Sequence, residues 1–373
     1  MNDSLPELAF ALGGLAGNNA HGAGFLQAAL DEDVRPAMIS CTSGQIRWVY
    51  QYLRDPAERK DTLRQIMERD IASMDPFKVK VIDFLNVVAQ GVPDVFRPVW
   101  RDWPLEYLEN LASAMQRFLR DPLNTVPLIE FLRTLPSRLM APEHKPGYFD
   151  DVSRVFNSSD VGVVFNSFNP VDGTENVYLN EVARRLLTKP KKKRGTSNYL
   201  PGERSSYRER TVYQGITPGG LRDALWLYNY GFNPEERPDA YALFIDGAYF
   251  RQIILNELTP VRCIIVVRPI NYRWIGELPK NWADLEDFKT KMIFNGTYDG
   301  ERHRILLINK LLEKTVLDRD DYHSIELIEM ELQRLRGFLD YMFEDMGVFN
   351  NAYDRAREVL QGYQHRQHHL QGH

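Results

Sequence analysis

The sequence has little cysteine and no long apolar run. Its 373 residues include two cysteines, Cys41 and Cys263, and each lies within an apolar, strand-like stretch. Two isolated cysteines of this kind indicate buried thiols in a reducing compartment rather than a disulfide framework. Because no stretch of about 18 apolar residues occurs, the sequence predicts no membrane-spanning helix. The first ten residues, MNDSLPELAF, contain acidic but no basic side chains, so we expect no secretory signal and a cytoplasmic protein.

The sequence also lacks an excess of positive charge. The formal net charge is −5, and proteins that bind polyanions usually carry a basic excess, so we expect no nucleic-acid partner. Hydrophobic residues make up 43% and charged residues 26% of the chain, which is ordinary for a globular protein. The histidines between residues 365 and 373 have no second type of ligand at a suitable spacing, and we therefore expect no metal site.

Short apolar runs alternate with helical patterns at the beginning of the chain. Helical spacing follows the first two runs, in a helix that begins with residues 25–30 and in one at 45–54. This alternation predicts an α/β fold with a mostly parallel central sheet covered by helices. A turn at Asp172-Gly173 separates two later runs and predicts a hairpin. In all, apolar runs predict strands at residues 8–12, 37–42, 161–170, 175–180, 239–246 and 261–267.

Two segments interrupt this pattern. From residue 57 to 150, helical apolar spacing with proline breaks predicts a helical insertion. Within it, residues 77–100 have the amphipathic order of a lid or interfacial helix over a lipid-binding groove, and equally that of an insertion packing its own core. Residues 189–210 are basic and polar, which predicts a mobile loop that is solvated or touches anionic headgroups.

The last hundred residues have helical spacing. This pattern predicts a helical C-terminal region over residues 276–373. The apolar positions that recur three and four residues apart are Ile325, Ile328, Leu332, Leu335, Leu339 and Met342.

Ser43 lies where a predicted strand gives way at once to a predicted helix. A sharp turn at such a point lifts a hydroxyl out of the sheet edge, and the N-terminus of the following helix favours developing negative charge. The usual pattern is G-x-S-x-G, whereas this chain reads Cys41-Thr42-Ser43-Gly44-Gln45 and lacks both flanking glycines. An ordinary serine near a helix N-cap is therefore the alternative interpretation.

Two further segments add to the interpretation of Ser43. Gly13-Gly14 follows the first strand and precedes a loop of small residues with His21, and such a loop aims backbone N–H groups at an oxyanion or is simply a glycine-rich turn. The loop has no G-K-[ST], and no acidic residue ends the second strand, so we expect no nucleotide cofactor. Asp246 ends an apolar run and is followed by Gly247. Alone it is typical of a turn, but together with Ser43 it is a candidate general base.

In chain order, the stretches LGGLAGNNAHGAGFLQAAL, ISCTSGQI and IDGAYF resemble the three motifs of the patatin-like phospholipase family. Arg35-Pro36 before the elbow and FNSFNPVDGTENVY before the aspartate add to the resemblance, which covers residues 8–50 and 160–270. Three differences stand out: Leu15 replaces the third loop glycine, Cys41 and Gln45 replace the elbow glycines, and Gly17, Asn18 and Asn19 stand where the family has an Arg or Lys.

The resemblance implies a three-layer patatin-like fold and a Ser–Asp dyad with no histidine between the two residues. Ser43 would attack an ester carbonyl and form an acyl-enzyme, and Asp246 would take and return the proton. Backbone N–H groups of Gly13, Gly14 and Leu15 would hold the oxyanion.

On this interpretation residues 1–275 form the acyl hydrolase domain, and residues 276–373 form a helical region packed on it. The substrate would be a lipid or other acyl ester, with peripheral contact at a membrane surface. The alternatives are a catalytically degenerate patatin-like protein that binds a lipid or a partner, and an ordinary Ser-His-Asp hydrolase in which His303 or His323 approaches Ser43.

Overall fold

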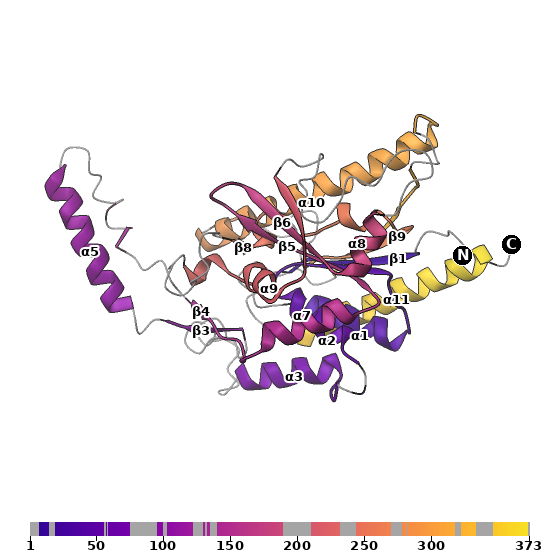
Figure 1. The fold of residues 1–373 in the computed structure, drawn as a ribbon, viewed down its shortest axis with the longest axis horizontal. Coiled ribbons are helices and arrows are strands. Elements are labelled where there is room, and N and C mark those ends of the chain that lie inside the picture. The colour runs from indigo at the N-terminus through magenta and orange to yellow at the C-terminus, as the bar shows by residue number, and fades with distance from the viewer. Residues whose placement is uncertain are drawn as a thin grey trace. The chain divides into compact units, whose positions relative to one another are not determined.

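The computed structural model divides the chain into two compact units (Figure 1). The first contains residues 1–72, 147–225 and 242–373, and the second contains residues 73–146 and 226–241. The structure describes residues 7–14, 19–55, 57, 59–74, 95–99, 103–121, 130, 133–134, 140–188, 210–231, 244–269, 278–280, 282–317, 322–332 and 346–371.

The first unit is built on a mostly parallel sheet, which the described residues show as eight strands. Every strand pair in it is parallel except β5 with β6 and β5 with β8. The strand order is β10 (Glu326–Met330), β9 (Cys263–Val267), β1 (Leu8–Leu12), β2 (Met38–Cys41), β5 (Gly162–Asn169), β6 (Thr174–Leu179) and β7 (Thr211–Gly215), with the short β8 (Ile245–Asp246) paired to β5.

Helices cover both faces of this sheet (Figure 1). In β9, Ile265 packs into one core and Ile264 into the other, as expected for a parallel strand buried on both sides. The helices of the first core are α1 (Ala20–Asp31), α2 (Gln45–Leu53), α3 (Leu63–Met74), α7 (Tyr148–Ser158), α9 (Pro218–Ala224) and α11 (Met346–Gln371). Those of the second are α8 (Glu181–Thr188), η4 (Asn256–Leu258) and α10 (Trp282–Glu313). The expected α/β fold with a mostly parallel, helix-covered sheet is confirmed.

Most of the predicted elements of the first unit are present. Strands occur at each predicted run, although only the last residues of the run at 239–246 are described, as β8. The predicted hairpin joins β5 to β6, and Gly173 in its turn has a φ of +71°. Helix α1 begins at Ala20, earlier than predicted. Its small residues allow α11 to approach closely, since a Cβ on Gly24 would lie 2.3 Å from the carbonyl oxygen of Phe349.

The helix predicted across residues 325–332 is wrong. This segment contains β10, which pairs in parallel with β9 and places Ile328 opposite Ile265. Ile328 and Met330 face one core and Leu327 the other, so the period is two rather than three or four. Leu335, Leu339 and Met342 lie outside the described residues. Helices α10 and α11 are present within 276–373, but that region is not wholly helical because β10 belongs to the central sheet.

The second unit contains most of the predicted insertion. Helix α5 (Trp103–Arg120) agrees with the helical spacing of the predicted insertion. Strand β3 (Phe96–Pro98) pairs with β4 (Met140–Pro142) in an antiparallel ribbon. A 3₁₀ turn, η1 (Tyr228–Tyr230), also belongs to this unit. The insertion begins later than predicted because α3 packs into the core of the first unit through Leu63 and Met67.

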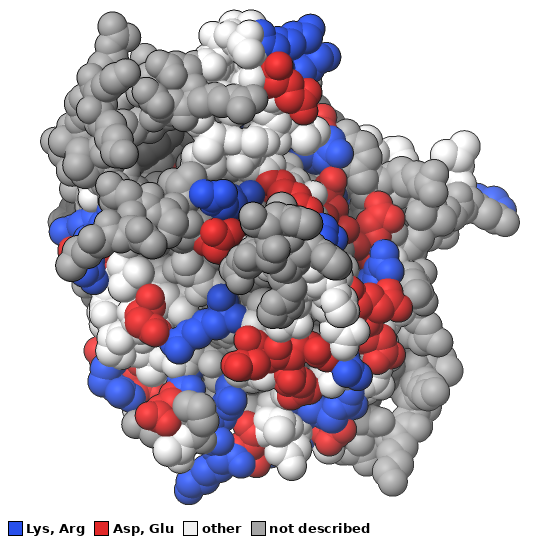
Figure 2. Space-filling model, turned by 90° about the vertical axis from the view of Figure 1, so that its right-hand side faces the viewer, with Lys and Arg blue, Asp and Glu red and all other residues white. Residues whose placement is uncertain are grey.

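Several other predictions fall on segments outside the described residues. The amphipathic stretch at 77–100 is described only at its end, where β3 lies, and residues 189–209 of the basic loop are not described. None of the described helices combines the length and apolarity needed to cross a bilayer. On the face in Figure 2, basic and acidic side chains are interspersed among the described residues, so no broad patch of one sign appears there.

Candidate functional site

Ser43 occupies a sharp turn between β2 and α2. Strand β2 ends at Cys41, α2 begins at Gln45, and Ser43 has a φ of +54°. This left-handed conformation is costly for a residue with a side chain, and it is typical of the strained nucleophile elbow. The Ser43 side chain does not cap α2, whose N-cap is Gly44. Ser43 therefore lies next to the N-cap of α2, as the alternative interpretation expected, without capping the helix itself.

The glycine-rich loop meets this elbow at Gly14. A Cβ on Gly14 would lie 2.2 Å from the carbonyl oxygen of Thr42 and 2.6 Å from the Cβ of Ser43. Real Cβ atoms do not approach so closely, so the contact requires glycine at this position. The structure thus brings together the first two motifs of the sequence.

Gln45 fits into the elbow because of a glycine elsewhere. Its side chain extends toward α1, where a Cβ on Gly22 would lie 2.0 Å from the Gln45 Oε1 atom. The Gln45 amide donates to the carbonyl oxygen of Asn19 at 3.3 Å and lies 3.0 Å from His21 Nε2. The missing elbow glycine is therefore compensated by space in α1, and the turn at Ser43 is retained.

Asp246 reaches the elbow through the pairing of β8. Val164 of β5 pairs with both β2 and β6, and Ser167 pairs with both β8 and β6. Strands β2 and β8 therefore share the edge of β5 that β6 does not occupy. Because β8 lies just beyond the carboxyl end of β2, Asp246 arrives beside the turn that holds Ser43.

The Ser43 hydroxyl lies against the Asp246 carboxylate, and its hydrogen-bonding interaction with that group lowers the pKa of Asp246. The Asp246 carboxylate also accepts the N–H of Ala248 at 2.9 Å. Burial raises the pKa of Asp246 to about 7, although both of these hydrogen bonds act in the opposite direction. Only 3% of Ser43 and 1% of Asp246 is exposed. A buried carboxyl group that ionises near neutral pH is suited to act as a general base.

The amides of Gly13 and Gly14 are not available to an oxyanion. The N–H of Gly13 donates to the carbonyl oxygen of Val267 at 3.0 Å, and the N–H of Gly14 donates to Thr42 Oγ1 at 2.9 Å. The predicted oxyanion role of these two residues is therefore wrong in this conformation. The pairing of β1 with β9 continues one residue past the strand and occupies the first amide, and the elbow threonine occupies the second. Leu15 lies outside the described residues.

None of the described candidate histidines contacts Ser43 or Asp246. His21 Nε2 lies 2.8 Å from the carbonyl oxygen of Gly13, and burial lowers the pKa of His21 to about 4, so the ring is neutral at pH 7. His323 contacts the carbonyl oxygen of Val261, before β9 and thus at the amino end of the sheet. His303 is exposed on α10. The Ser-His-Asp alternative has no support in this arrangement.

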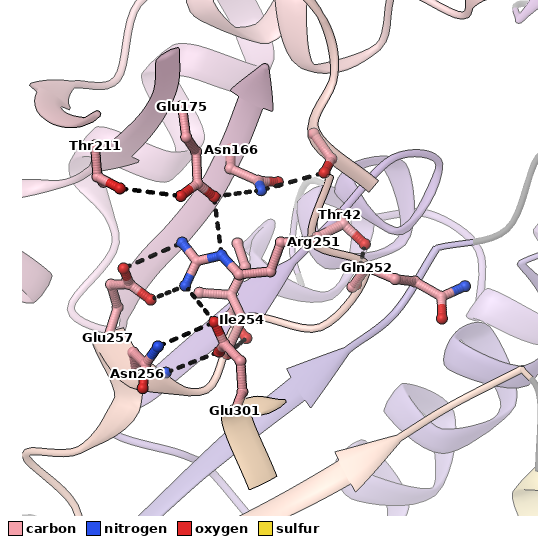
Figure 3. A network of polar contacts seen from close by, with 12 residues as sticks. Thr42, Asn166, Glu175, Thr211, Arg251, Gln252, Ile254, Asn256, Glu257 and Glu301 are labelled. Atoms are coloured by element: carbon pink, nitrogen blue, oxygen red, sulfur yellow. Dashed lines mark hydrogen bonds and ion pairs between the residues drawn. The ribbon is translucent and has the colours of Figure 1, made fainter. Parts of the chain in front are cut away.

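A buried cluster of charges anchors the segment that follows Asp246 (Figure 3). Arg251 contacts Glu257 at 2.6 Å, Glu175 at 2.8 Å and Glu301 at 3.0 Å, and all four side chains are at most 3% exposed. Burial lowers the pKa of Arg251, but the attraction of the three carboxylates outweighs this effect and raises it. The cluster joins β6, η4 and α10 to the chain just after the candidate base.

The cluster could not be predicted from the sequence because its members are far apart in the chain. Glu175 and Glu301 lie in different elements, and nothing in their neighbours predicts burial. The one available signal was Arg251 in FRQIIL, a stretch that is apolar apart from Arg251 and Gln252. Among the described residues, no group of three His, Cys, Asp or Glu side chains is arranged to hold a metal ion.

Comparison of the sequence with known proteins finds no matching family model and no matching curated protein. The resemblance to patatin-like phospholipases therefore depends on the three motifs. What the structure adds is that these motifs meet at one edge of the sheet, around Ser43 and Asp246.

Proposed function

We propose that the protein is a serine acyl hydrolase of the patatin-like type that cleaves lipid or other acyl esters. The observation that carries this proposal is that Ser43, held at a φ of +54° in a strand-to-helix turn, faces the buried carboxylate of Asp246. A strained serine at a strand-to-helix turn with a base on its hydroxyl is the arrangement that nucleophilic catalysis requires.

In the proposed reaction, Asp246 accepts the hydroxyl proton of Ser43 as the oxygen attacks the ester carbonyl. The protonated carboxyl group then donates this proton to the leaving alcohol, which leaves an acyl-enzyme on Ser43. Asp246 next deprotonates a water molecule that attacks the acyl group, and it returns this proton to Ser43 Oγ as the acyl–oxygen bond breaks and the acid is released. The residue after an elbow nucleophile commonly supplies an oxyanion donor, so we assign this role to the N–H of Gly44, at the N-terminus of α2.

The second candidate is a catalytically degenerate protein of the same fold that binds a lipid or a partner. Two observations favour it: Ser43 is 3% exposed, and the amides of Gly13 and Gly14 are bonded within the protein. A hydrolase with this site needs the residues that cover Ser43 to move before an ester reaches it. The hydrolase remains the better proposal because a binding module has no need for a base on a strained serine.

We also propose a cytoplasmic location with peripheral contact at lipid surfaces, since lipid esters are presented there. Helix α5 of the second unit supports this contact. It exposes apolar side chains at spacings of three, four and seven residues, as interfacial helices do: Leu105, Leu108, Met115 and Leu119.

A fluorophosphonate probe, followed by peptide mapping, tests the proposal. We expect the wild-type protein to be labelled at Ser43, Ser43→Ala to remain unlabelled, and Asp246→Asn to react much more slowly. Folded wild-type protein that is not labelled, with or without phosphatidylcholine vesicles, would contradict the hydrolase. If such protein still binds those vesicles, and Ser43→Ala binds them equally well, the degenerate binding protein is supported instead.

A further inference from the structure

The three motifs are joined by a closed ring of buried hydrogen bonds beside Ser43. The N–H of Gly14 donates to Thr42 Oγ1 at 2.9 Å, and the Thr42 hydroxyl donates to the carbonyl oxygen of Gln252 at 2.7 Å. The Gln252 amide then donates to the carbonyl oxygen of Gly14 at 3.0 Å, which closes the ring. Each of the three residues belongs to a different motif region: the glycine-rich loop, the elbow, and the segment after Asp246.

Thr42 has the central place in this ring. Its hydroxyl accepts one hydrogen bond and donates another, so the position of its single proton is fixed. Thr42 is fully buried and immediately precedes Ser43, whose φ is unfavourable for a residue with a side chain. A strained turn persists only when its surroundings hold it, and here the bonds of Thr42 tie the turn to two other segments.

The partners of Thr42 are themselves held in place. The peptide between Gly13 and Gly14 is bonded at both ends, since its carbonyl oxygen lies 2.8 Å from His21 Nε2 and its N–H donates to Thr42. Gln252 follows Arg251, and the two side chains extend in opposite directions (Figure 3). The Arg251 guanidinium is bound by three buried carboxylates. These ion pairs hold the backbone of Arg251, and therefore that of the adjacent Gln252, in place.

We propose that Thr42 and Gln252 are positioning residues that hold the elbow serine and the glycine-rich loop in register with the candidate base. This inference rests on the proposed hydrolase activity. The ring keeps the Ser43 hydroxyl directed at Asp246, and it holds the N–H of Gly14 on Thr42. Neither positioning residue contacts the reacting atoms. Their removal therefore affects the rate of the chemical step rather than the binding of the ester.

The experiment compares Thr42→Val, which removes the hydroxyl at nearly constant shape, with Thr42→Ser, which keeps it. We expect Thr42→Val to lower kcat for a soluble ester, and the rate of fluorophosphonate labelling, by at least about tenfold with KM unchanged, because a misplacement of about 1 Å is worth up to about 100-fold in rate. Thr42→Ser should react like the wild-type protein. Gln252→Met, which keeps the chain length but not the amide, should behave like Thr42→Val.

Hydrogen–deuterium exchange supplies a readout that does not depend on activity. We expect the amide of Gly14 to exchange faster in Thr42→Val than in the wild type and to remain protected in Thr42→Ser. If the wild type is labelled, and Thr42→Val and Gln252→Met react as fast as the wild type, the positioning role is overturned. The proposed hydrolase activity would still stand. An unlabelled wild type would overturn the hydrolase and the positioning role with it. If Thr42→Val does not fold, Gln252→Met is compared with Thr42→Ser. The proposal then requires slower labelling and ester hydrolysis, and faster exchange of the Gly14 amide, in Gln252→Met alone.

Discussion

Replacing Asp246 with Asn should make the protein more stable while it greatly slows the proposed reaction. Burial raises the pKa of Asp246 from 3.8 to about 7, so its charge is unfavourable in the folded state. Each tenfold change in an ionisation constant corresponds to about 1.4 kcal/mol, and the whole shift to about 4 kcal/mol. Asparagine never bears this charge, and its carbonyl oxygen can still accept the N–H of Ala248.

The pH dependence of this difference follows from linkage. Between about pH 4 and pH 7 the native carboxyl holds a proton that the unfolded chain has lost, so the wild type loses stability as the pH rises through this window. Below about pH 4 the Asp246 charge does not affect the free energy of unfolding. Above about pH 7 it lowers the free energy of unfolding of the wild type by the full amount, about 4 kcal/mol. Other titrating groups are common to both proteins and cancel in the difference.

Urea unfolding at pH 5, 6, 7 and 8 measures this difference by linear extrapolation. We expect the free energy of unfolding of Asp246→Asn, relative to the wild type, to increase with pH and to level off above about pH 7. A difference that stays constant over this range would refute the reasoning, because Asp246 would then ionise alike in the folded and unfolded states. A difference that falls with rising pH would show that the folded protein favours the charge.

Three further predictions concern the same site. Labelling of Ser43 by a fluorophosphonate should rise with pH through about 7, where Asp246 becomes ionised, and a rate that is flat from pH 5 to pH 9 would contradict this. Gly22→Ala should destabilise the protein by about 1–3 kcal/mol, and less in a Gln45→Ala background, because its Cβ would lie 2.0 Å from Gln45 Oε1. A urea double-mutant cycle with no coupling would show that the two side chains do not collide. Arg251→Met should lower the free energy of unfolding by about 3–5 kcal/mol, since it leaves three buried carboxylates unpaired, and an unchanged urea midpoint would argue against the cluster.

The strands of the central sheet could largely be predicted because they are short apolar runs buried on both faces. The exception is β10, whose sequence ELIEM suits both a helix and an edge strand. What placed it in the sheet was its pairing with β9, a contact between distant segments that local spacing does not record. The start of α1 was missed for a similar reason: its glycines look like loop residues until α11 is seen to pack against Gly24.

Ser43 and Asp246 became candidates because each follows an apolar run at a turn and because their motifs, in chain order, resemble those of patatin-like phospholipases. Their meeting depends on β8 sharing an edge of β5 with β2, which only the topology shows. The hydrogen-bond partners of the Gly13 and Gly14 amides could not be predicted. They are the carbonyl oxygen of Val267 and the side chain of Thr42, which lie far away in the chain. The roles of buried polar side chains are set by tertiary contacts, and local sequence carries little of that information.

The central claim, that Asp246 acts directly on a nucleophilic Ser43, is tested most directly by a crystal structure of the protein after reaction with a fluorophosphonate. The account predicts phosphorus bonded to Ser43 Oγ, the Asp246 carboxyl within hydrogen-bond distance of the adduct, and the N–H of Gly44 donating to the phosphoryl oxygen. An adduct on another residue, or one on Ser43 that has a histidine rather than Asp246 beside it, would contradict the account.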